Sequence, residues 1–152
     1  MPRNNHLLAV ILWMSAIFLF STELFASSNT SSFLGPFLAA LFPSLTADQL
    51  DSFHLLLRKF GHWSEYALLG MLLMRAVSGQ FPLWQKTRQC IYALAIATLY
   101  AASDEWHQSF VPSRSASITD VVIDGFGALC AVIWYSRRQS NADSSRNQAK
   151  KT

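Results

Sequence analysis

Residues 103–124 read SDEWHQSFVPSRSASITDVVID, and this stretch decides the fold of the chain. It gathers acidic residues, a histidine, a glutamine and an arginine between two apolar runs, residues 90–102 and 118–135. A short polar link between two apolar runs is typical of two membrane helices joined by a loop at the membrane surface.

The rest of the chain agrees with a membrane protein. Of its 152 residues, 51% are hydrophobic, 13% aromatic and only 14% charged, which excludes disorder and indicates a single domain. Four apolar runs follow one another: residues 7–24, 63–77, 90–102 and 118–135. The third run is short and must include flanking residues such as Arg88 and Trp106 to cross about 30 Å of hydrocarbon. We expect an all-α fold, an integral membrane bundle of four transmembrane helices.

Two alternatives stay open. A soluble helical bundle is disfavoured, because the first run is too long and too apolar for a solvated helix. The first run also has the outline of a cleavable signal peptide, with a basic residue, an apolar core and small residues at 26–28. Glu23 and the lack of a clean A-x-A site favour a retained anchor.

The basic residues predict the orientation. With the N-terminus inside, nine of the 12 Lys and Arg lie on the inner side, and only Arg58, Lys59 and Arg114 lie outside. The positive-inside rule then predicts a multi-pass protein of the cytoplasmic (inner) membrane with both termini in the cytoplasm. Residues 1–136 form the transmembrane domain. Residues 137–152 form a basic, disordered cytoplasmic tail that suits anionic lipid rather than nucleic acid.

The first outer segment, residues 26–60, passes through LGPFLAALFP at 34–43. Thr46 and Gln49 then make a capping box before a helical pattern. We expect an interfacial or re-entrant helix that turns into the second span at Gly61.

Polar residues from three helices are expected at the same outer surface. Each group shares a helix face or lies one turn apart: Lys59, His62 and Tyr66; Asp104, His107 and Gln108, with Glu105 beside Gln108; and Asp120 and Asp124, after Ser117 as the N-cap. Charged groups at this depth are costly unless they pair or face a wet cavity, so the pattern predicts an enclosed site facing outward. Gly125, Gly127, Ala128 and Ala131 are expected to allow close helix packing.

The segments KFGHWSEYALLG (59–70) and SDEWHQSFVPSRSASITDVVIDGFGA (103–128) resemble the VanZ-like family of small polytopic membrane proteins. The family pattern falls on Lys59, His62, Tyr66, Glu105, Gln108, Pro112, Arg114, Asp120 and Gly127. Ser113 and Asp124 depart from it, since the family often has Gly and Asn there. The resemblance implies a link with resistance to teicoplanin-type glycopeptide antibiotics, and a layout similar to enzymes that exchange or hydrolyse phospholipid head groups.

Cleavage of a phosphodiester needs cations around the phosphate and a base for the attacking group. Arg114 can bind phosphate bidentately and Lys59 can add a point charge. His62 or His107 is the candidate base or nucleophile, oriented by Glu105 or Asp120. The remaining polar residues of the three helices are expected to bind substrate: Tyr66, Asp104, Gln108 and Asp124.

Two other interpretations compete with this site. One is a structural polar network that ties three helices together. The other is a metal site, since His62 with Glu65 and Asp104 with His107 have an i, i+3 spacing seen in helical carboxylate sites. Because Lys59 and Arg114 would repel an ion, we expect no metal and no cofactor.

The sequence therefore predicts a membrane-embedded enzyme that processes a lipid-linked phosphate at the outer face, by hydrolysis or head-group transfer. A phospholipid or a lipid-linked cell-wall precursor on a polyprenyl carrier is the expected partner. The alternatives are a metal-dependent membrane hydrolase and a non-catalytic envelope protein that binds such a lipid. Nothing in the sequence predicts the oligomeric state.

Overall fold

The computed structural model describes residues 4–22, 35–112, 114 and 116–149. The elements are helices: α1 (Asn4–Phe20), a short helix over residues 35–41, α3 (Ala47–Gln80), α4 (Lys86–Gln108) and α5 (Ile118–Ala149). The described part of the chain contains no strand, which confirms the all-α prediction. The predictions for Glu23, for residues 26–28 and for Ser113 concern positions outside the described residues.

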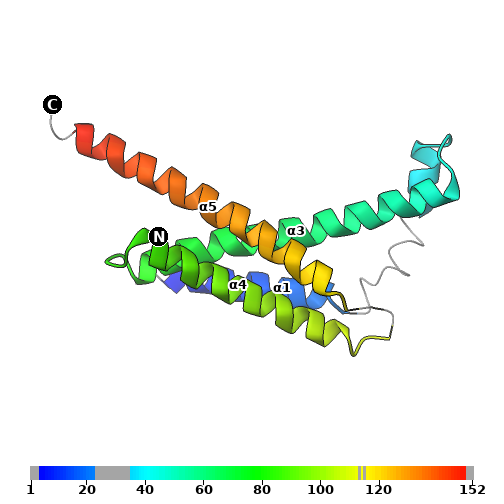
Figure 1. Cartoon of the computed structure of the whole chain (residues 1–152), viewed down its shortest axis with the longest axis horizontal. Coiled ribbons are helices and arrows are strands. Elements are labelled where there is room, and N and C mark those ends of the chain that lie inside the picture. Colours follow the sequence, from blue (N-terminus) through cyan, green and yellow to red (C-terminus); the bar gives the residue numbers. More distant parts are fainter. Residues whose placement is uncertain (1–3, 23–34, 113, 115, 150–152) are drawn as a thin grey trace.

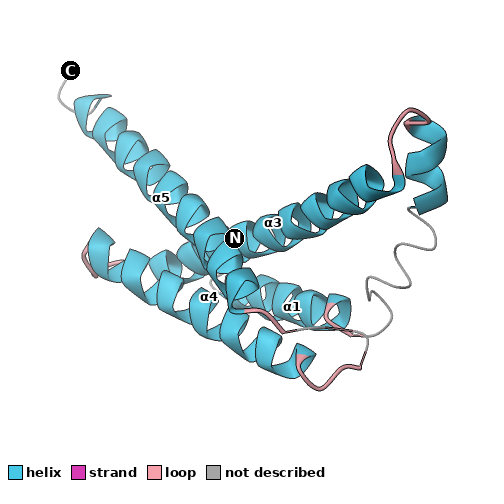
Figure 2. Ribbon diagram, turned by 45° about the vertical axis from the view of Figure 1, so that its right-hand side comes forward, coloured by secondary structure: helices cyan, strands magenta, loops and turns pink. Residues whose placement is uncertain are grey.

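Two long helices cross at the centre of the molecule (Figure 1). The crossing joins the middle of α3 to the N-terminal half of α5, while α1 and α4 lie alongside it (Figure 2). The N-terminal part of α3 and the C-terminal part of α5 extend away from the bundle on opposite sides. The bundle therefore has four long helices around one crossing.

Small residues make the α3–α5 crossing possible. A Cβ on Gly127 would overlap the backbone carbonyl of Trp63, and a Cβ on Gly70 would lie 2.7 Å from the carbonyl oxygen of Ala128. The two backbones therefore touch, as in membrane helix pairs with small residues at the contact. Close packing is confirmed for Gly127 and Ala128, whereas a Cβ on Gly125 would meet Thr98 Oγ1 at an ordinary 3.7 Å.

Helix α4 turns its small and polar residues inward and its large apolar residues outward. On α4 the buried face carries small or polar residues: Gln89, Ala93, Ala97, Ala101, Asp104, Glu105 and Gln108. The opposite face exposes Ile91 (64%), Leu99 (72%) and Trp106 (69%). A helix in water shows the reverse arrangement, because exposed apolar area costs about 25 cal/mol per Å². This distribution suits a surrounding of lipid.

Length and composition single out one helix as a candidate span. Among the described helices, α5 over Ile118–Ser145 is long and apolar enough to cross a membrane, and α1 is apolar over the shorter range Asn5–Phe20. The four-span bundle is therefore not confirmed by this criterion, and the other three spans stay a prediction.

The expected turn at Gly61 is absent. The capping box of Thr46 and Gln49 is confirmed, with both reciprocal hydrogen bonds present at 2.9 and 3.4 Å. From there α3 continues without a break for 34 residues. A single glycine costs a helix only about 1 kcal/mol, and no proline follows to end it, so the interfacial helix and the second predicted span are one helix.

The tail also differs from its prediction. Residues 137–149 continue α5 instead of being disordered. They contain no Gly or Pro, and three serine hydroxyls, of Ser140, Ser144 and Ser145, donate to the carbonyls one turn earlier. These local bonds fit a helix that extends beyond the bundle.

Candidate functional site

All four long helices contribute to a polar end of the bundle. Ser21, directly after α1, donates a hydrogen bond to Asp104 on α4. Lys59 on α3 donates to Asp120 on α5, and Glu105 on α4 accepts from the backbone of Ser117, just before α5. The C-terminal ends of α1 and α4 thus meet the start of α5 and the middle of α3. The polar segments of α3, α4 and α5 were expected to meet, whereas the contribution of α1 was not.

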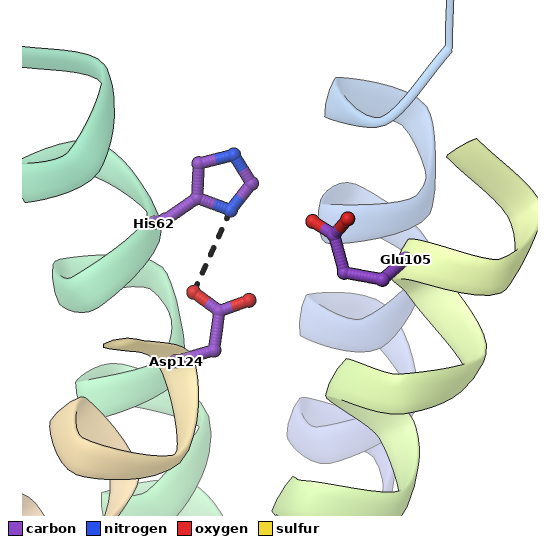
Figure 3. A group of neighbouring side chains, drawn as sticks. All are labelled: His62, Glu105 and Asp124. Carbon is purple, nitrogen blue, oxygen red and sulfur yellow. Dashed lines mark ion pairs between the residues drawn. The ribbon is translucent and has the colours of Figure 1, made fainter. Parts of the chain in front are cut away.

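Three side chains from different helices form the centre of this region. They are His62 on α3, Glu105 on α4 and Asp124 on α5, and one ligand atom from each lies within 4.8 Å of the others (Figure 3). His62 Nδ1 and Asp124 Oδ1 are 3.5 Å apart. The exposed fractions are 9%, 4% and 0%, so the group is buried. We call these three residues the central group.

The central group is unusual because several of its buried polar atoms make no hydrogen bond to the described part of the chain. They are both carboxylate oxygens of Asp124, Oε1 of Glu105 and Nδ1 of His62, of which His62 and Asp124 form an ion pair when the histidine is protonated. Glu105 Oε2 accepts from the Ser117 N–H at 2.8 Å. A buried polar atom without a hydrogen bond is costly to a folded protein, so such atoms mark a place kept for something other than stability.

Tyr66 lies one helical turn from His62 on the same face of α3. Its side chain is 0% exposed, and its hydroxyl makes no hydrogen bond within the described residues. A buried phenol normally finds a partner. Tyr66 therefore adds a donor to the same unsatisfied region.

A second network surrounds Asp104, and here both carboxylate oxygens are hydrogen-bonded. Asp104 Oδ1 accepts from Ser21 Oγ at 2.6 Å, and Oδ2 accepts from Gln108 Nε2 at 2.9 Å. Arg114 donates to Gln108 Oε1 at 3.4 Å and to the carbonyl of Phe20. These residues, expected to bind substrate or phosphate, connect the end of α1 to α4.

Asp120 belongs to a third set, an ion-pair cluster with two cations of α3. Lys59 Nζ lies 2.9 Å from Asp120 Oδ1, and Arg58 Nη2 lies 3.8 Å from Oδ2. Lys59 is 33% exposed and Arg58 24% exposed, so both cations remain accessible from outside.

His107 stands apart from the central group. Its ring packs against Phe18 of α1 with the centroids 4.7 Å apart. Of the two i, i+3 pairs that suggested a metal, neither brings both partners into the central group, because Asp104 is hydrogen-bonded elsewhere and Glu65 is not a member. The structure places His62, but not His107, beside Glu105.

Arg114 lies in the loop between α4 and α5 and is partly buried. Burial lowers the pKa of its guanidinium, and nearby Arg58 lowers it further. The shift follows from a charged group held away from water.

Two residues of this region escaped the sequence analysis. Ser21 is the partner of Asp104, and Arg58 faces Asp120. The sequence carried a weak signal for each. Ser21 is a polar residue at the outer end of an apolar run, and Arg58 precedes Lys59, but neither position reveals which carboxylate it meets.

Two comparisons with known proteins find no similar protein: no curated protein and no solved structure matches the chain. The profile of the VanZ/LLP1 family matches residues 6–139, which include α3, α4, most of α1 and α5, and the central group. The chain belongs to the VanZ/LLP1 family.

Proposed function

We propose that this chain is a multi-pass membrane enzyme that hydrolyses or transfers the head group of a lipid-linked phosphate at the central group. Membership of the family fits a role in the cell envelope and in glycopeptide resistance. The observation that carries the proposal is the buried His62–Glu105–Asp124 group with its unpartnered atoms. Perturbed, unsatisfied groups of this kind are typical of reaction centres.

The surroundings support membrane insertion through all four helices. From His62 to Gln80 the C-terminal part of α3 supplies the buried residues of the bundle, and α4 has 23 residues. Helices of this size are about 30–35 Å long, close to the thickness of the hydrocarbon layer. Their exposed apolar faces then lie against lipid. The charge distribution supports an orientation with the polar end at the outer surface.

The cations near the central group suit a phosphate. Lys59 and Arg58 are partly exposed beside Asp120, and Arg114 lies near the end of α1. A lipid phosphate that approaches from the membrane surface meets these charges first. Its glycerol or polyprenyl part would stay in the lipid, next to the apolar faces of α4 and α5.

The reaction forms one bond to phosphorus and breaks another. Water or an acceptor hydroxyl forms a new bond to phosphorus, and the P–O bond to the head group or the carrier breaks. The attacking oxygen gives its proton to a base of the central group, and the leaving oxygen takes up a proton. The groups that supply these proton transfers are the imidazole of His62 and the carboxylate of Glu105.

The rival is an envelope protein that binds the same lipid without turning it over. Purified full-length protein in liposomes should be incubated with a panel of phospholipids, a polyprenyl phosphate and a polyprenyl diphosphate, and the lipids analysed by mass spectrometry. The proposal expects a product from at least one of them, formed in proportion to protein and time. Saturable binding without any product would support the rival instead.

A further inference from the structure

We propose that the central group holds a divalent transition-metal ion, with Nδ1 of His62 and one carboxylate oxygen each from Glu105 and Asp124 as its protein ligands. The sequence alone favoured a site without metal. The i, i+3 spacing in the sequence had suggested two pairs of ligands, each on a single helix. The structure instead brings together one ligand from each of three helices.

The distances suit a metal centre. Ligand atoms bound to Zn²⁺ at about 2.0–2.2 Å in a tetrahedral arrangement are about 3.4 Å apart. His62 Nδ1 and Asp124 Oδ1 are 3.5 Å apart, and all three ligand atoms lie within 4.8 Å of one another. Side-chain rotations on the order of 1 Å therefore complete the coordination.

Unpartnered atoms supply a second, independent argument. Asp124 is fully buried, and neither of its oxygens has a hydrogen-bond donor among the described residues. Oε2 of Glu105 accepts a hydrogen bond from the Ser117 N–H, whereas Oε1 has no hydrogen-bond partner among the described residues. The orientation of Glu105 is therefore fixed by a second contact, as is common for metal ligands, while its other oxygen points toward His62 and Asp124 (Figure 3).

Charge balance points to a divalent ion. Two carboxylates and a neutral imidazole carry two negative charges. Of the other carboxylates in this region, Asp120 is paired with Lys59, and Asp104 accepts hydrogen bonds from Ser21 and Gln108. Glu65 also lies near enough to His62 to interact with it electrostatically. Lys59, which was expected to repel a metal, is bound by Asp120, so the ion-pair partner of Asp124 in the described structure is His62.

The ligand types narrow the choice of ion. An imidazole nitrogen with two carboxylate oxygens suits Zn²⁺ or Mn²⁺ better than Mg²⁺ or Ca²⁺, which prefer oxygen alone. Three protein ligands leave coordination positions open, as in catalytic rather than structural sites. This inference rests on the proposed function for the role of the ion, which would bind a phosphate oxygen and lower the pKa of a bound water. With the ion bound, activation of this water by the metal would take over the role of base that the metal-free reaction assigns to His62 and Glu105. The assignment of the three ligands does not depend on the proposed function.

Metal binding can be measured without a substrate. Full-length protein carrying a purification tag without histidine should be stripped with a chelator in detergent and titrated with Zn²⁺ or Mn²⁺. Bound metal is measured by mass spectrometry, and thermal stability by an unfolding scan. We expect about one ion per chain and a higher melting temperature with metal.

Two ligand variants and one matched control make the test specific. Asp124→Asn and Glu105→Gln should weaken binding at least about 100-fold and abolish the stabilisation by metal. Glu105→Gln keeps an oxygen for the Ser117 N–H, so it tests the site even if the other variant does not fold. The control Asp104→Asn removes another buried carboxylate, one whose oxygens are both hydrogen-bonded. This variant should still bind the metal, although its melting temperature should be lower.

The outcomes also separate this inference from the proposed function. Wild-type protein that binds no more metal than Asp124→Asn, or a lipid turnover that survives complete removal of metal, overturns the metal site and leaves the enzyme standing. Specific metal binding in a protein that turns over no lipid phosphate supports the site and contradicts the enzyme.

Discussion

Oδ1 of Asp124, on the second turn of α5, lies 3.5 Å from Nδ1 of His62 in the middle of α3, and neither atom is hydrogen-bonded within the described residues. Asp104, only a short distance along the same end of the bundle, has both of its oxygens bonded. The two buried aspartates of this region thus differ in the number of hydrogen bonds that their carboxylates accept. That difference leads to opposite predictions for the two positions.

Asp124→Asn should leave the free energy of unfolding of the metal-free protein unchanged or raise it, because the change removes a buried charge whose oxygens accept no hydrogen bond within the described residues and whose ion-pair contact with His62 is long, at 3.5 Å. Asp104→Asn should lower it by about 1–3 kcal/mol, since the amide cannot accept both hydrogen bonds and its NH₂ group faces another donor. Thermal unfolding of both variants in the same detergent checks this. A larger loss for Asp124→Asn than for Asp104→Asn would assign Asp124 to a structural network.

Gly127→Ala should disrupt the α3–α5 crossing. Its new Cβ would overlap the carbonyl of Trp63, next to His62, so the helices must move apart and the central group with them. We expect a loss of about 2–4 kcal/mol in stability and a loss of activity.

Gly61→Ala is the matched control for that substitution. A Cβ at Gly61 has no atom within 4 Å in the described structure, and alanine favours the helix by about 1 kcal/mol. Unfolding scans should therefore show a rise in stability. If both glycine variants behave alike, close contact at the crossing is not what Gly127 provides.

Lys59→Met removes a partly exposed charge and keeps the length of the side chain. Asp120 retains Arg58 at 3.8 Å, so the fold should persist. We expect kcat/KM for the lipid phosphate to fall about 10-fold or more, mainly through KM, because a charge that attracts the phosphate is lost. Lys59→Arg should restore most of it. Kinetics that are unaffected by Lys59→Met would remove this lysine from the phosphate site.

Cysteine labelling tests the orientation. In protein whose Cys90 and Cys130 are replaced by serine, a cysteine at Ser109 should react with an impermeant thiol reagent in intact cells, whereas one at Ser140 should not. Both positions are exposed. Reaction at Ser140 alone would place the polar end of the bundle in the cytoplasm.

Much of this molecule could be predicted from local sequence patterns. The capping box at Thr46, the close-packing role of Gly127 and the meeting of three polar segments all follow from spacing on single helices. Such patterns fix which face a residue occupies. They also predicted Lys59 near Asp120 at one end of the bundle.

Other features depend on how helices are rotated against each other. Asp104, His107 and Gln108 share one side of α4, and Gln108 does bond Asp104 one turn away, yet packing turns His107 to Phe18 of α1. The grouping of His62, Glu105 and Asp124 needs three helices in register, which no single periodicity encodes. The continuity of α3 through Gly61 was also missed, because a glycine weakens a helix without ending it.

The most direct test of the central claim is the turnover of the lipid phosphate by wild-type protein and by Asp124→Asn, Glu105→Gln and Gly61→Ala, compared at equal amounts of folded protein. We predict that the two variants of the central group lose at least about 100-fold in rate while they remain folded, and that Gly61→Ala keeps the wild-type rate. Full activity in both Asp124→Asn and Glu105→Gln would contradict the account, because the buried group would then take no part in the reaction.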